Sequence, residues 1–468
     1  MKKNIFFIIF MTLGLLICAL PFVGMAWARS DEAIGNETQT VFPKITDSDG
    51  KFNYHVLDEM GSWFETHYAY RPQLIDADAK VQRAVFKESN TDSVTVGKDG
   101  WLFYSSTTND FMGRNTLTER QIFNLANNIS IMQRYVEGQG CKFLFMIPPN
   151  KNSLYGENMP YYYSVPESFE HGRDHFAEAL ADAGVNYLDL FEMFGKETEV
   201  LYLKEDSHWN NEGARLVYNQ SLDILEVDHE SYDTVPVERL RMHAGDLAAM
   251  IFPASNNLEW DYAYEPKAFE YLPVSEMQEE FSVEDPRIHT MSAEGKGNLV
   301  MYRDSFGNTL IPFMGGTFGE CFFSKAIPYD LANDMKKYDP DVLIVEMVER
   351  NIRNLIENAP VLPALKTGYT EFDLMQIAGV KVMAEACMAN MTYVSFSGTV
   401  DKILIDDDDV IFVGIPDKDG NMTIYEAFTV TSGGSDYSFI AYLPQSQTGP
   451  AEEIDTESIR VFTERTGE

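Results

Sequence analysis

Cysteine and positive charge are both scarce in this chain. Only four cysteines occur among 468 residues, eight histidines are scattered along the sequence, and neither a CxxC pair nor an HExxH motif is present. Structural zinc sites and zinc proteases need ligands clustered in such motifs. A metal-dependent hydrolase is therefore the least favoured enzyme class, and we expect neither a metal nor another cofactor.

The cysteines also predict no disulfide framework. Cys18 falls inside a long apolar run, which leaves Cys141, Cys321 and Cys387 for the rest of the chain. An odd number cannot pair completely within one chain. Because Cys141 and Cys321 stand beside apolar, strand-like runs, we expect buried free thiols.

Acidic residues outnumber basic ones by about two to one. The chain has 36 Lys and Arg against 73 Asp and Glu, a formal net charge of -37. Such a charge repels nucleic acids and anionic polymers over a Debye length of about 10 Å, although local basic clefts can override it. We therefore predict no nucleic-acid partner and an acidic surface suited to life outside the cell.

The N-terminal segment predicts export. Lys2 and Lys3 precede an apolar run from Ile5 to Ala28. Its length fits a membrane-spanning helix, while the small residues around Trp27 fit a cleavage site, so residues 1–28 are a signal peptide or a membrane anchor. The lysines favour a cytoplasmic N-terminus, which places the remainder outside, at the cell surface or in the periplasm.

A polar linker over residues 29–51 leads to a long α/β region over 52–362. Its apolar strands alternate with amphipathic helices, a pattern typical of a parallel sheet sandwiched by helices. Residues 227–295 are weakly periodic and read as an excursion over the active-site end. The expected elements are a helix over 57–74, a hairpin over 96–104, helices over 118–138 and 166–183, and strands over 142–149, 185–190, 298–306, 320–326 and 340–350.

Beyond residue 362 the pattern changes to short β-type runs, which predicts a small β-sandwich-like module over 363–468. Asp406 to Asp409, and Asp417 to Asn421, are interpreted as turns rather than calcium loops. In the second, Phe428 occupies the position where an EF-hand has its last ligand. The runs cover residues 381–388, 392–400, 402–415, 422–430 and 437–444.

Two short motifs carry the chemistry. Ser305 follows an apolar strand in YRDSFGN, which places its hydroxyl at the carboxyl edge of the sheet, with Gly307 allowing a tight turn. A serine needs a base held by a carboxylate, and DSHWN supplies both in Asp206 and His208. Either motif alone is commonly a helix cap or a strand-end turn. Their joint presence in one predicted sheet favours a catalytic triad.

From about Phe64 to Arg350 the chain resembles the DHHW proteins and the AlgX/AlgJ-like alginate O-acetyltransferases of the SGNH hydrolase superfamily. The resemblance implies an SGNH-hydrolase-like fold with a permuted sheet. It also implies that Asp206 and His208 match the family's DxHW motif and that Ser305 is the nucleophile. The motifs that carry it, in the family's order, are VGKDGWLFY, IPPNK, DSHWNNEGA, YRDSFGN and VLIVEMVERN.

The chain departs from the family pattern at two positions. Ser207 replaces the first of the two histidines that give DHHW proteins their name, and Arg303 replaces the glycine of the GDS found in many alginate acetyltransferases. Arg303 either shapes the oxyanion surroundings and the substrate site or pairs with Asp304, and we favour the pairing.

Residues around the motifs supply candidates for the supporting roles. We expect the oxyanion to be bound by the Ser305 backbone N–H, with Asn308 and Arg350 as further donors. Trp209 offers a face on which a sugar stacks, against the alternative of core packing.

The resemblance implies an extracytoplasmic O-acetyltransferase or acetylesterase acting on a cell-surface or exopolysaccharide through an acyl-serine intermediate. It also implies a membrane-bound O-acyltransferase as the partner that supplies acetyl groups. The alternative is a non-catalytic carbohydrate-binding or assembly protein of a polysaccharide-modification system. The complete set of Asp206, His208 and Ser305 favours the enzyme.

Overall fold

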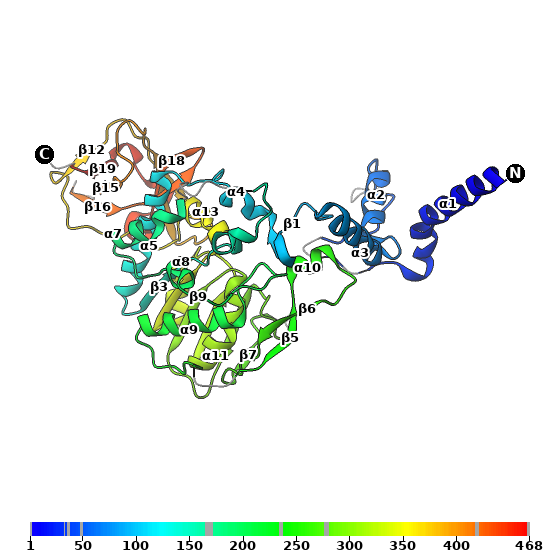
Figure 1. Ribbon diagram of the computed structural model, residues 1–468. Coiled ribbons are helices and arrows are strands. Elements are labelled where there is room, and N and C mark those ends of the chain that lie inside the picture. The colour runs from blue at the N-terminus through cyan, green and yellow to red at the C-terminus, as the bar shows by residue number, and fades with distance from the viewer. Residues whose placement is uncertain are drawn as a thin grey trace.

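The computed structural model describes residues 2–31, 33–34, 38–46, 50–163, 172–233, 237–275, 280–416 and 421–465. The long N-terminal helix α1 (Lys2–Ala28) lies at one end of the molecule and the C-terminal strands at the other (Figure 1). Within α1, Ile5–Ala28 is long and apolar enough to cross a membrane. This helix fits either a signal peptide or an anchor.

The helix expected over 57–74 is two helices, α2 (Val56–His67) and α3 (Arg71–Val81). Tyr70 between them has a left-handed backbone with φ of +59°, and Pro72 lies in the first turn of α3. Proline lacks the N–H that a continuing helix needs, but it is favoured at a helix start. The expectation of one helix was therefore wrong.

The hairpin predicted around Lys98 to Gly100 is confirmed. Strands β1 (Val94–Val96) and β2 (Leu102–Tyr104) pair antiparallel, with Val96 opposite Leu102. Gly100 has φ of +89° in the turn, a conformation that glycine adopts without strain. A short helix α4 (Thr108–Phe111) follows.

A mixed sheet of seven strands forms the centre, in the order β4-β3-β11-β9-β10-β8-β7. The strands from β4 to β10 run parallel, as predicted, whereas β8 and β7 extend the edge antiparallel. Part of the predicted excursion over 227–295 thus belongs to the sheet itself. The strands are β3 (Lys142–Met146), β4 (Tyr187–Leu188), β7 (Glu270–Leu272), β8 (Arg287–Met291), β9 (Asn298–Tyr302), β10 (Glu320–Ser324) and β11 (Val342–Glu346).

Helices cover both faces of this sheet, and Figure 1 shows α9 and α11 over one of them. In β3, Phe143 and Phe145 pack toward α5 while Leu144 and Met146 pack toward α9, because successive side chains of a strand point to opposite faces. The α/β sandwich is confirmed. Its helices are α5 (Glu119–Glu137), α6 (Lys151–Leu154), α7 (Phe176–Asp182), α8 (Leu190–Gly195), α9 (Asn211–Ile224), α11 (Ile311–Thr317), α12 (Leu331–Tyr338) and α13 (Arg353–Glu357).

Two helix predictions have different outcomes. Thr118 and Gln121 form the predicted capping box at the start of α5. The helix expected over 166–183 is α7 preceded by a 3₁₀ turn over Gly172–His175, and residues 166–171 lie outside the described part. Cys141 and Cys321 are buried, as expected.

A separate hairpin stands beside the sheet. It consists of β5 (Arg239–Ala244) and β6 (Leu258–Tyr262), which pair antiparallel, with helix α10 (Asp246–Ile251) in the connection. The register of the pair shifts between Arg241 and His243, so Met242 is an extra, bulged residue. The hairpin lies within residues 227–295, which were predicted to be an excursion over the active-site end.

The C-terminal region is all-β, as predicted, with two antiparallel sheets in the orders β12-β19-β15-β16 and β13-β14-β18-β17. The boundary at residue 363 stays a prediction, because Phe428 and Val430 join the same apolar core as α5. The elements are β12 (Leu374–Gln376), β13 (Met383–Ala386), β14 (Tyr393–Thr399), β15 (Phe412–Pro416), β16 (Met422–Glu426), β17 (Phe428–Ser432), β18 (Ser435–Pro444), α14 (Gln445–Thr448) and β19 (Arg460–Glu464).

The acidic run at Asp406 to Asp409 is a turn, as predicted, but residues 402–405 before it form no strand. The buried Arg120 of α5 explains the turn, since its Nη1 donates to the backbone carbonyls of Asp407 and Asp409 at 3.1 and 2.8 Å. The turn predicted over Asp417 to Asn421 falls mostly on residues 417–420, which lie outside the described part of the chain.

Candidate active site

Ser305 stands at the carboxyl end of β9, where the chain leaves the sheet and enters a 3₁₀ helix over Phe306–Leu310. Asp304 fixes this exit, because its carboxylate accepts hydrogen bonds from Phe306 N and Val348 N, both at 2.9 Å. The Asp304 N–H in turn donates to the buried Glu346 of β11 at 3.0 Å. Neighbouring strand ends thus hold the Ser305 backbone from two sides.

Asp206, His208 and Ser305 form one hydrogen-bonded chain. His208 Nε2 lies 2.8 Å from Ser305 Oγ, and His208 Nδ1 lies 2.7 Å from Asp206 Oδ1. Asp206 is 2% exposed, and it lines, together with His208 and Ser305, a cavity of about 400 Å³. The structure therefore brings together the three residues predicted as the triad, with the geometry of a nucleophile, a base and an orienting carboxylate.

Asp206 has a second histidine partner that the sequence did not reveal. His243 of β5 places Nε2 2.9 Å from Asp206 Oδ2, and the Asp246 N–H donates to the same oxygen at 2.8 Å. The His208 N–H donates to Oδ1 at 2.8 Å, so both carboxylate oxygens are held by two groups each. This carboxylate has a single fixed orientation.

Asp206 and the two histidines, His208 and His243, stabilise one another's charged forms. Burial alone would raise the pKa of Asp206, but His208 and His243 hold it well below its ordinary value. Burial opposes the protonated forms of the two histidines, yet the charge of Asp206 and its hydrogen bonds leave both pKa values raised. Asp206 therefore stays ionised and stabilises the imidazolium that His208 becomes when it accepts a proton.

Lys151 of the IPPNK motif holds the loop that carries Asp206. Its buried ammonium donates to the backbone carbonyls of Leu203 and Lys204 at 3.0 Å and of Asp206 at 2.5 Å. The same ammonium lies 5.6 Å from the ring centroid of Trp101, in the predicted hairpin. Burial lowers the pKa of Lys151 to about 8. Three of the motifs that carry the family resemblance thus meet at one buried charge.

The predicted oxyanion donors differ in position. The Ser305 N–H makes no hydrogen bond within the described residues, and it is free to bind an oxyanion. Asn308 lines the Ser305 cavity, with Nδ2 donating to Glu284 Oε1 at 2.6 Å. Arg350 does not line this cavity; its guanidinium lies 5.3 Å from the ring centroid of Phe306 and lines another depression. The structure does not support Arg350 as an oxyanion donor.

The two predicted substrate-binding residues are in the core. Trp209 is 0% exposed, its ring packs edge-on against Phe306, and its Nε1 donates to Thr309 Oγ1 at 2.5 Å. A fully buried ring cannot stack on a sugar, so that prediction was wrong. Trp209 instead holds the His208 loop against the helix that follows Ser305.

Arg303 is also 0% exposed. Its guanidinium donates to the backbone carbonyls of Val283 and Asp285, both at 3.0 Å, and to the side chain of Asn308. It bonds the backbone carbonyl of Asp304 rather than the carboxylate. The full burial of Arg303 contradicts the substrate-binding role, whereas the favoured pairing with Asp304 is present as a hydrogen bond to its backbone carbonyl. The arginine anchors the edge segment beside the cavity.

Comparison with known proteins agrees with the predicted family. Residues 94–281 match the family described as SGNH hydrolase-like domain, acetyltransferase AlgX, which confirms the resemblance read from the motifs. No curated protein matches the chain.

Three solved structures align with this chain at low sequence identity. Bacillus cereus PatB1 with a sulfonyl adduct is 16% identical, covers 57% of this chain and 96% of its own, and has a TM-score of 0.43. A DHHW family protein from Eubacterium siraeum is 16% identical, with 58% and 98% covered and a TM-score of 0.42. Pseudomonas aeruginosa AlgX is 13% identical, with 83% and 97% covered and a TM-score of 0.36.

Proposed function

We propose that this chain, which carries an SGNH hydrolase-like domain of the AlgX acetyltransferase family over residues 94–281, is a serine-dependent O-acetyltransferase or acetylesterase acting on polysaccharide. The observation that supports this most is the hydrogen-bonded chain from Asp206 through His208 to Ser305 at the end of a parallel strand. Each member has its partner within 3 Å, and all three residues line one cavity, with Ser305 at the end of the chain.

The reaction begins with proton transfer from Ser305 Oγ to His208 Nε2. The oxygen attacks the acetyl carbonyl of the donor, and the tetrahedral oxyanion accepts a hydrogen bond from the Ser305 N–H and from the Asn308 amide. His208 then returns the proton to the leaving alcohol, which departs and leaves acetyl-Ser305.

The second half repeats these steps with a sugar hydroxyl as nucleophile. His208 takes the hydroxyl proton, the sugar oxygen attacks the acetyl-serine carbonyl, and Ser305 leaves with the proton. Water in the same place gives hydrolysis. We favour transfer, because Tyr264, Pro266, Pro312 and Phe313 give the cavity an apolar wall that suits a sugar ring better than bulk water.

The cellular setting is part of the proposal. The proposed location is outside the cytoplasm, which is supported by the apolar helix α1, as a cleaved signal or a retained anchor. Acetyl groups then come from a membrane-bound O-acyltransferase. In this arrangement residues 52–362 form the catalytic domain and residues 363–468 an accessory β module.

The experiment is ester turnover by the full-length protein in detergent micelles, with p-nitrophenyl acetate as the donor. We expect Ser305→Ala and His208→Ala each to lower the rate at least about 10³-fold, because each removes a member of the triad. Ser130→Ala on α5 and His289→Ala on β8 are matched controls, since neither residue lines the cavity. Turnover that survives both triad substitutions would contradict the proposal, and wild-type inactivity would favour the carbohydrate-binding alternative.

A further inference from the structure

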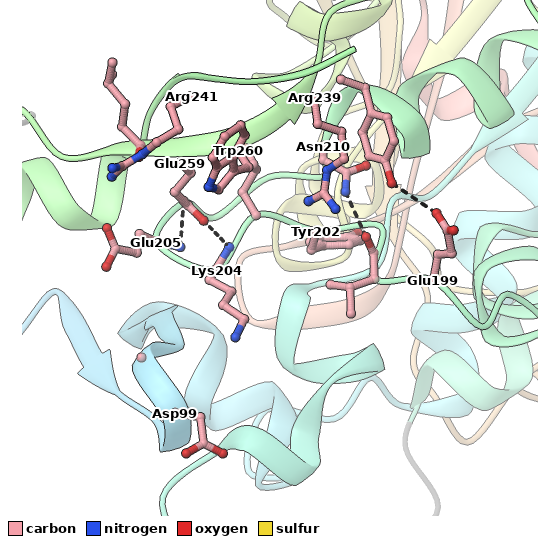
Figure 2. A pocket seen from close by; sticks show the side chains of 15 residues that line it. Asp99, Glu199, Tyr202, Lys204, Glu205, Asn210, Arg239, Arg241, Glu259 and Trp260 are labelled. Carbon is pink, nitrogen blue, oxygen red and sulfur yellow. Dashed lines mark hydrogen bonds between the residues drawn. The ribbon is translucent and has the colours of Figure 1, made fainter. Parts of the chain in front are cut away.

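A second hollow lies on the other side of the β5–β6 hairpin. This groove has a volume of about 640 Å³ and is lined by the hairpin, the loop over residues 199–205 and the β1–β2 turn at Asp99 (Figure 2). None of Asp206, His208 and Ser305 lines it. We propose that the groove binds a neutral glycan segment of the acceptor polymer, which rests on the proposed function.

The hairpin presents aromatic and cationic side chains to the groove in alternation. Arg239 pairs across the strands with Tyr262, and Arg241 pairs with Trp260. Side chains of directly opposite residues share a face of the sheet, and residues two apart on one strand do too. Figure 2 shows Trp260 between the two arginines, over the groove.

The bulge at Met242 gives the hairpin two different faces. Without it, His243 would share the face of Arg239 and Arg241, because side chains alternate with a period of two. One extra residue reverses the alternation, so His243 points to Asp206 while the arginines point to the groove. The same short strand therefore serves the Ser305 cavity and the groove.

Trp260 is 56% exposed, and this exposed aromatic surface suits a sugar. The C–H face of a sugar ring packs on an aromatic face, while its hydroxyl rim needs donors and acceptors close by. Arg239 and Arg241 have no carboxylate partner within the described residues. Arg241 Nε donates to the Leu258 backbone carbonyl at 3.0 Å, and the other guanidinium N–H groups of the two arginines can donate to sugar hydroxyls. The Glu205 carboxylate accepts no hydrogen bond there and can accept from a hydroxyl.

The charge of the lining indicates a neutral glycan. The groove's basic side chains, Lys204, Arg239 and Arg241, are outnumbered by carboxylates, in a chain whose net charge is -37. The carboxylates are those of Asp99, Glu199, Glu205 and Glu259. A polyanion would be repelled both by these carboxylates and by the protein as a whole. A neutral, hydroxyl-rich chain uses donors and acceptors of both kinds.

Hydrogen bonds and close backbone packing connect the groove to the loop that carries Asp206. Glu259 of β6 accepts hydrogen bonds from the backbone N–H groups of Lys204 and Glu205, both at 2.8 Å, as Figure 2 shows. Gly245 packs so closely on the Glu205 carbonyl that an added Cβ would lie 2.3 Å from it. A glycan in the groove therefore rests on the segment that leads directly into Asp206, and it holds the acceptor polymer beside the reacting cavity.

The test is calorimetric binding of cellohexaose, chitohexaose and polygalacturonate to the full-length protein in detergent. We expect at least one neutral hexasaccharide to bind. Trp260→Ala and Arg241→Ala should each weaken that binding about tenfold, while Phe372→Ala, which removes an exposed aromatic elsewhere, should not. Thermal unfolding midpoints confirm that each variant is folded.

Ser305→Ala separates this inference from the proposed function, because it should bind the hexasaccharide like wild type. If esters are not turned over but binding depends on Trp260, the proposed enzyme fails and the groove stands. Binding of polygalacturonate alone, no binding of any probe, or hexasaccharide binding that Trp260→Ala leaves unchanged would each overturn the inference.

Discussion

The two hollows on either side of the β5–β6 hairpin are built in opposite ways. In the Ser305 cavity, the working groups are fixed by buried hydrogen bonds, with Asp206 held through both carboxylate oxygens. In the groove, Trp260 and the two arginines are exposed and have few partners. Prearranged buried groups suit chemistry, and exposed groups with unused bonding capacity suit reversible binding. Substitutions on the two sides should therefore change different quantities.

The largest effect on the cavity side should come from Asp206→Asn. The amide keeps the shape but lacks the charge that stabilises protonated His208, so we expect the rate of p-nitrophenyl acetate turnover to fall about 10³-fold or more. Asp261→Asn is a matched control, because Asp261 is also buried and accepts a backbone N–H, from Asn211 at 2.9 Å. Equal rate losses in the two variants would mean that Asp206 has only a structural role.

Lys151→Met should reduce both stability and turnover. It leaves the backbone carbonyls of Leu203, Lys204 and Asp206 without their donor, and we expect a loss of about 1–3 kcal/mol in the free energy of unfolding. The loosened loop should also slow ester turnover. Lys142→Met is the control, since Lys142 likewise bonds backbone carbonyls, but at Leu225 and Glu226. Unchanged turnover in a destabilised Lys151 variant would show that the loop position does not matter.

His243 should set the pH range of activity. Turnover requires neutral His208, so the rate should fall as pH drops through the raised pKa of His208. His243 faces Asp206, Asp261 and Glu259 and competes for the Asp206 charge. Removing it in His243→Ala should raise the pKa of His208 further and move the midpoint of the rate profile to higher pH.

His243→Gln provides the matched comparison for that profile. The glutamine amide can still donate to Asp206 Oδ2, so its midpoint should stay near that of wild type. If both variants lower the rate equally at every pH, His243 only fills space, and the difference between the two faces of the hairpin loses its main support.

The smallest effect on turnover should come from Arg120→Met, far from both hollows. Arg120 is 1% exposed and bonds carbonyls of the turn at Asp406 to Asp409, so its loss should cost about 1–3 kcal/mol of unfolding free energy. Turnover per folded molecule should be unchanged. Arg134→Met breaks the pair between the half-exposed Arg134 and the buried Glu426, and we expect a smaller loss than for Arg120 because Arg134 itself stays in contact with water. A larger loss for Arg134 would reverse this order.

The sequence predicted the elements whose signals are local. The capping box of Thr118 and Gln121 predicted the start of α5, and continuous apolar runs predicted the buried strands. Capping and burial both produce sequence patterns that span only a few residues. The positions of Asp206, His208 and Ser305 followed from two motifs at strand exits and from the family resemblance. Their mutual distances could not be read from sequence but agree with the expected triad.

The remaining features depend on contacts that are distant in sequence. His243 stands 37 residues from Asp206 in a weakly periodic segment, and only the bulge at Met242 turns it inward. Trp209 and Arg303 were predicted as substrate-binding residues, yet packing against Phe306 buries Trp209, and hydrogen bonds to the carbonyls of Val283 and Asp285 hold Arg303 in the interior. A pattern of residue types alone does not reveal which side chains a fold covers.

The most direct test of the account is mass spectrometry of the protein during turnover of p-nitrophenyl acetate. We expect one acetyl group on the peptide that contains Ser305, absent from Ser305→Ala and strongly reduced in His208→Ala. Turnover with the acetyl group on another residue, or with no acetylated Ser305 in rapidly quenched samples, would contradict the acyl-serine mechanism.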